Sequence, residues 1–228
     1  MITIDLPDPP LFRVELTPDS RQVRSGEASV QPPSSSIELG QPTVVRLTSK
    51  TAQDDKELAS YIAAEKGKFQ YNYVRLVCSF YPSEGEQFDK AWLEVELASD
   101  SPKSAIAWSM NPNNVHESVK RTSTAKVGAA LKFLSSEMSE SAQVDEKLYS
   151  IRGYREATAK PFWEMKRTDL ATLDGLFHFH LVVRSPYQEE TRGTVKFSTT
   201  IGTRRFLVFY DQRPKDVPVE EFYLGAIK

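Results

Sequence analysis

Apolar and polar side chains alternate at every second position through most of the chain after residue 68. In the stretch "KFQYNYVRLVCSFYP", the alternation places on one face Val74, Leu76, Cys78 and Phe80. The opposite face carries Tyr71, Tyr73 and Arg75. The same period of two recurs in the segments 90–99, 125–134, 147–157, 160–167, 175–185, 193–201 and 204–212. A period of two indicates β-strands, and apolar residues on one side only indicate sheets that are buried on one face.

The gaps between these segments are too short for crossover helices, so they predict antiparallel pairing. We expect the polar stretch "SPYQEETRG" (185–193) to join two paired strands, and a tight turn at Gly202 to join the next two. The predicted fold is therefore mainly β: an antiparallel β-sandwich, or an open barrel, with one short helix and an N-terminal arm.

The helix is predicted over residues 52–66. Thr51 and Asp54 resemble an N-terminal capping pair, and Leu58, Tyr61 and Ile62 share one helical face. Lys66 and Gly67 provide a stop signal. A short strand, 42–49, is expected before this helix.

The chain before residue 42 has a different character. It is rich in Pro, Ser and Gly between residues 18 and 41, a composition that cannot bury much apolar surface. We therefore divide the chain into an N-terminal arm with a flexible segment (1–41) and a β-sandwich domain (42–228). The arm is expected to add a strand at a sheet edge, and the acidic stretch 135–147 is expected to form an exposed loop.

Charge and cysteine content limit the partners and the cellular location that we expect. The formal net charge is −2, so there is no overall attraction to nucleic acid or anionic lipid. Cys78 is the single cysteine, so no intramolecular disulfide can form, and its place in the alternation predicts a small buried side chain. The N-terminus does not resemble a signal peptide, and no stretch approaches the roughly 18 apolar residues of a membrane helix. We expect a reducing, cytoplasmic location.

Two of the three histidines, His178 and His180, lie in "GLFHFHLVVRS" with one residue between them. If Phe177 and Phe179 face the core, both imidazoles share the other face, roughly 6.5–7 Å apart along the strand. Some metal enzymes use two imidazoles of one strand in this way, but a third ligand is required. The remaining histidine, His116, is expected in a loop. We therefore favour a semi-exposed strand face over a metal site.

Other chemistry-bearing patterns are weak. Phosphate loops, dinucleotide fingerprints, nucleophile elbows and zinc-protease motifs are absent from the sequence. Glu94 and Glu96 are interpreted as a solvated strand face. Tyr71 and Tyr73 could stack on bases, although the charge disfavours nucleic acid. Trp163 is expected in the core.

The sequence favours a non-catalytic interaction module that works through protein–protein contacts or self-association. We assign no catalytic, cofactor-binding or metal-binding residue, and expect no cofactor, no membrane partner and no small-molecule substrate. The alternatives are a self-assembling shell or coat subunit and a metal-dependent enzyme that uses His178 and His180. A further hypothesis, membrane pore formation, rests on the alternating run "TSTAKVGAALKFLSSEMS" (122–139).

Overall fold

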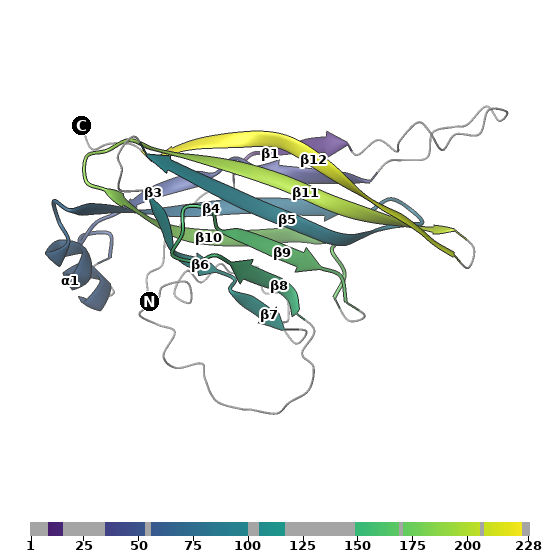
Figure 1. The fold of residues 1–228 in the computed structure, drawn as a ribbon, viewed down its shortest axis with the longest axis horizontal. Helices are drawn as coiled ribbons and strands as arrows, with labels where there is room; N and C mark the ends of the chain where they lie inside the picture. The colour runs from purple at the N-terminus through teal and green to yellow at the C-terminus, as the bar shows by residue number, and fades with distance from the viewer. Residues whose placement is uncertain are drawn as a thin grey trace, which may run out of the picture.

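The fold consists of two antiparallel six-stranded sheets that pack face to face (Figure 1). The computed structural model describes the ranges 9–15, 35–52, 56–99, 105–116, 149–168, 171–205 and 208–224. The predicted mainly β class, the sandwich-like pair of antiparallel sheets and the short helix are confirmed.

The first sheet, called sheet A here, has the strand order β1-β2-β4-β10-β6, and β3 also pairs with β4. Its strands are β1 (Leu11–Glu15), β2 (Ser36–Gly40), β3 (Thr43–Leu47), β4 (Phe69–Tyr81), β6 (Ile106–Asn111) and β10 (Gly175–Pro186). Strands β2 and β3 lie along the same side of β4, one after the other, because each is much shorter than β4.

The second sheet, sheet B, has the strand order β12-β11-β5-β9-β8-β7. Its strands are β5 (Glu86–Ser99), β7 (Asn114–His116), β8 (Tyr149–Tyr154), β9 (Phe162–Lys166), β11 (Thr191–Arg205) and β12 (Val208–Leu224). The long strands β5, β11 and β12 run beside one another across the molecule (Figure 1).

Aromatic side chains from both sheets meet in the core. Phe80 of sheet A contacts Phe88 and Phe197 of sheet B, with ring centroids 5.0 and 5.7 Å apart. Trp163 of sheet B contacts Phe179 of sheet A at 5.1 Å and is fully buried, as predicted. Cys78 is also fully buried, and its burial raises the pKa of the thiol. The predicted core face of β4 is therefore confirmed.

Helix α1 (Lys56–Ala64) covers one end of the outer face of sheet A. Tyr61 stacks on Trp108 at 5.5 Å and meets Tyr71 edge to face at 6.0 Å. The helix begins later than predicted. Thr51 exchanges hydrogen bonds with Thr48 in the preceding turn (2.8 and 3.1 Å), and the expected capping partner, residue 54, lies outside the described residues.

Two predicted connections are wrong. Strands β10 and β11 do not pair, because the chain crosses from sheet A to sheet B between them. The amide of Tyr187 still bonds to the carbonyl of Lys68 (3.1 Å) before the chain enters β11 at Thr191. Gly202 is no turn: β11 runs through it to Arg205, and β12 starts at Val208.

Strands β6 and β7 had no counterpart in the prediction, and His116 ends β7 instead of lying in a loop. The chain changes from sheet A to sheet B between these strands. Here the indole Nε1 of Trp163 donates a hydrogen bond of 2.8 Å to the carbonyl of Pro112. A core side chain is therefore hydrogen-bonded directly to the segment in which the chain crosses between the sheets.

The N-terminal region contributes two strands. β1 lies at the edge of sheet A, as predicted for the arm. β2 lies inside the span predicted to be flexible, 18–41, and that prediction is wrong for residues 36–40, where Ile37 and Leu39 are buried. Residues 1–8 and 16–34, and the predicted strand 125–134 and loop 135–147, lie outside the described residues. The division at residue 41 stays a prediction.

Gly193 is required by close packing. It lies opposite Phe222 in the β11–β12 ladder and opposite Leu97 in the β11–β5 ladder. A Cβ atom at this position would overlap the aromatic ring of Phe222, which is 4% exposed. The ring thus occupies the space that a side chain at position 193 would need.

We expect Gly193→Ala to destabilise the protein by about 1–3 kcal/mol, because an extra methyl group in a packed core forces its neighbours to move. Urea unfolding monitored by circular dichroism measures this change. Phe222→Leu removes part of the obstructing ring, so Gly193→Ala should cost less in that background. An equal cost in both backgrounds would contradict the proposed clash.

Candidate functional site

The predicted histidine pair lies on the outer face of sheet A, on strand β10. Phe179 and Leu181 point into the core, so His178 and His180 share the opposite face, as the alternation predicts. Their ring centroids are 6.5 Å apart and their planes differ by 5°. The predicted spacing is confirmed.

His180 has partners that the sequence did not reveal. It lies directly opposite Arg75 of β4 and Asn111 of β6. Tyr73, diagonal to it on β4, stacks on its ring with centroids 5.7 Å apart. The Tyr73 hydroxyl lies 2.5 Å from His180 Nδ1. We refer to Tyr73, Arg75, His178 and His180 as the histidine cluster.

The charge state of this cluster follows from burial. Tyr73 is 1% and His180 6% exposed. Burial, helped by the charges of His178 and Arg75, lowers the pKa of His180 to about 4. Burial raises the pKa of Tyr73 to about 12, and Arg75 opposes this shift. At neutral pH the phenol therefore keeps its proton and the imidazole is neutral, so the hydrogen bond between the Tyr73 hydroxyl and His180 Nδ1 joins two uncharged groups.

This arrangement is ill suited to acid–base catalysis. A general base works best when its pKa lies near the operating pH, whereas that of His180 is lowered far below neutrality. The atom Nδ1 is already engaged by Tyr73.

Metal binding also lacks support in the described part of the chain. No three His, Cys, Asp or Glu residues there are grouped closely enough to hold an ion. With Nδ1 bonded to Tyr73, His180 retains only Nε2 as a ligand atom. The hypothesis of a metal site at His178 and His180 gains no third ligand from these residues.

The structure also shows the environment of the other residues considered in the sequence, Glu96 and Tyr71. Glu96 pairs with Lys160 at 2.6 Å and with Lys196 at 3.5 Å on the outer face of sheet B. The hydrogen bond and charge of Lys160 lower the pKa of Glu96. Tyr71 is 1% exposed, so this ring and that of Tyr73 offer no open stacking surface.

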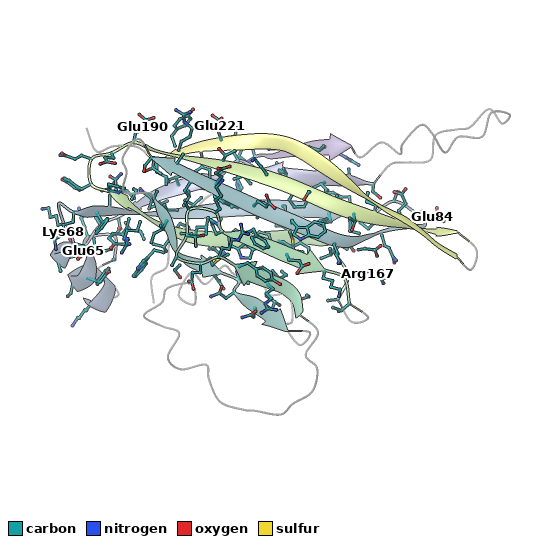
Figure 2. All side chains as sticks on the ribbon, in the orientation of Figure 1. Glu65, Lys68, Glu84, Arg167, Glu190 and Glu221 are labelled. Carbon is teal, nitrogen blue, oxygen red and sulfur yellow. The ribbon has the colours of Figure 1, made fainter. Side chains whose placement is uncertain are left out.

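Charged side chains otherwise lie at the periphery. Figure 2 places Glu65 and Lys68 beside α1 and Arg167 beyond the end of β9. Lys68 is 4.0 Å from Glu65, and Arg167 is 3.2 Å from Asp89. The Lys68 side chain is exposed, so its pair is typical of a solvated surface and contributes little to stability, whereas the Arg167–Asp89 pair is half-buried.

Comparison with known proteins shows only distant structural likeness. No family model and no curated protein sequence matches the chain. The NetB toxin of Clostridium perfringens in its membrane-inserted form matches 82% of this chain and 88% of its own, at 9% identity and a TM-score of 0.37. The delta-toxin of the same organism also matches 82% of this chain and 88% of its own, at 6% identity and a TM-score of 0.26.

A third similar structure contains manganese lipoxygenase of Gaeumannomyces graminis and part of zonadhesin of Komagataella pastoris. It matches 82% of this chain and 50% of its own, at 10% identity and a TM-score of 0.28. All three scores are too low to support a statement about function.

Burial of the neutral imidazole makes stability depend on pH. Because the pKa of His180 falls from 6.5 to about 4 on folding, the unfolded chain takes up a proton first as the pH drops. The free energy of unfolding has its full value from this linkage above pH 6.5. It falls by on the order of 3 kcal/mol in all as the pH drops towards 4. His180→Gln should remove this part of the pH dependence in urea unfolding.

Tyr73→Phe is the matched control, since it leaves the imidazole in place and burial is the main cause of the shift. That variant should keep the fall in stability between pH 6.5 and about 4. If His180→Gln showed the same fall as the wild type over this range, the assignment of a neutral, buried His180 would be wrong.

Proposed function

We propose that this protein is a non-catalytic module that acts by associating with further copies of itself. The observation that carries the proposal is the Tyr73–His180 hydrogen bond. It engages Nδ1 of the buried His180 imidazole, which burial keeps neutral at physiological pH. The sequence offers no other catalytic pattern.

Exposed apolar side chains support a role in contacts. Among the described residues the large hydrophobic side chains that remain exposed are Leu11, Tyr81, Leu176 and Tyr223. Clustered apolar surface on a soluble domain is typical of interaction sites. A shell or coat subunit would use the same kind of association repeated in more directions. We propose the cytoplasm as the location, which suits a chain with one buried thiol.

Light scattering after size-exclusion chromatography tests the proposal. The chain mass is 25.8 kDa, and we expect the measured mass to rise with concentration towards a multiple of this value. A mass that stays at that of one chain over the whole concentration range would refute self-association.

A second candidate function, insertion of a hairpin into a membrane, is favoured by one specific observation. Strands β7 and β8 pair antiparallel, and His116 lies opposite Tyr149. Residues 117–148 therefore connect two strands that pair with each other. These residues lie outside the described part of the chain. In the described part of the chain, no helix is long and apolar enough to span a bilayer.

Extending the His116–Tyr149 register inward gives two distinct faces. One would be mostly polar, with such pairs as Lys120–Asp145, Thr122–Gln143, Thr124–Ser141 and Lys126–Ser139, and with Gly128 and Ala130 towards the turn. The other would carry Ala125, Val127, Ala129, Leu131, Met138, Ala142 and Val144, interrupted by Glu117, Arg121, Ser123, Ser136, Glu140 and Glu146. A membrane-crossing strand needs about 9–11 alternating residues; under this register the turn would fall at residues 132 and 133, and the segment 121–131 that precedes it has this length.

Dye release from phosphatidylcholine vesicles, with and without phosphatidylserine, tests the second candidate. We expect the wild type to release dye, and Val127→Asp to abolish release because it adds a charge to the apolar face. Thr124→Asp, on the polar face, is the control and should retain release. Intact vesicles with the wild type, or equal release by both variants, would refute insertion through this segment.

A further inference from the structure

Three of the four large hydrophobic side chains that are exposed in the described part of the chain lie on one surface, the outer face of sheet A. Leu11, Tyr81 and Leu176 are 42%, 42% and 49% exposed. They lie outside because the residues that alternate with them pack into the core: Phe12 in β1, Phe80 in β4 and Phe177 in β10. This end of the face is not covered by α1, which packs around Tyr71 and Trp108.

The strand registers bring these residues together with two charges. Arg13 of β1 lies opposite Glu38 of β2, Glu38 lies opposite Ser79 of β4, and Ser79 lies opposite Leu176 of β10. Leu11 and Tyr81 lie in the rows on either side of this one. We call Leu11, Arg13, Glu38, Tyr81 and Leu176 the outer-face patch.

Small residues keep the patch open between its larger side chains. Ser79 separates Glu38 from Leu176, and Gly40 lies opposite Leu11. A Cβ atom on Gly40 would come within 3.3 Å of Leu11 Cδ2 and 3.2 Å of Val77 Cβ. Leu11 therefore lies over the glycine backbone.

The two charges of the patch are opposite in sign and are not paired with each other. The Arg13 guanidinium lies over the Tyr81 ring, 5.9 Å from its centroid. The Tyr81 hydroxyl donates to Glu38 Oε2 at 2.9 Å. Within the described part of the chain, neither Arg13 nor Glu38 forms an ion pair. Tyr81 thus holds a cation and an anion apart on an exposed apolar surface.

We infer that the outer-face patch is the surface through which two copies of this chain associate about a twofold axis. This inference rests on the self-association proposed above. A twofold contact joins the same patch on both copies, so a patch with one cation and one anion is complementary to itself. Arg13 of each copy faces Glu38 of the other, and Leu11, Tyr81 and Leu176 are withdrawn from water between them.

Sedimentation velocity over a concentration series compares wild type, Leu176→Glu and Tyr223→Glu. Tyr223 is 53% exposed, but it lies on β12 of sheet B, so it is the matched control. We expect Leu176→Glu to weaken association by about tenfold or more. Tyr223→Glu should leave association unchanged. Equal effects of the two substitutions, with a self-associating wild type, would overturn the surface while self-association stands.

A charge exchange tests the twofold pairing itself. Arg13→Glu and Glu38→Arg each bring like charges together in a homodimer, so each variant alone should associate more weakly than the wild type. An equimolar mixture of the two variants restores both opposite-charge pairs and should recover association. No recovery in the mixture would overturn the Arg13–Glu38 contact. A monomeric wild type would overturn both this inference and the proposed function.

Discussion

The structure depends on the filling of the space between two sheets by side chains from both. Every long strand sends alternate residues into that space, and the aromatic contacts there cross from sheet to sheet. Phe80 meets Phe88 and Phe197, and Phe179 meets Trp163. Since a shift of one residue would turn each of these rings outward, the core also determines which side chains face the solvent. The outer-face patch and the histidine cluster are consequences of this requirement.

Local alternation was sufficient to predict which way most side chains face. The burial of Cys78 and Trp163 and the common face of His178 and His180 all follow from a period of two. Strand pairing, by contrast, could not be predicted from alternation. The short polar link after β10 resembles a hairpin loop, yet β10 pairs with β4 and β6 because their apolar faces complete sheet A. Pairing depends on contacts between distant segments, which alternation within one segment does not encode.

The same limit applies to the candidate site. Both imidazoles were recognisable in the sequence, but their environment was not. Tyr73 is 107 residues away from His180 in the chain, and α1 covers the adjoining aromatic residues of the same face. Once these neighbours are in place, one member of the pattern that resembled a metal-binding pair, His180, is a neutral, hydrogen-bonded group. The turn expected at Gly202 failed for a related reason, because its partner strand β5 continues the ladder past that glycine.

The bond from the Trp163 indole to the Pro112 carbonyl has a mechanical consequence. It attaches the point where the chain changes sheets to a fully buried side chain of β9. The short ladder of β7 and β8 therefore projects from an anchored base. Because the same indole packs against Phe179 of sheet A, the crossing point is fastened to both sheets through one core side chain.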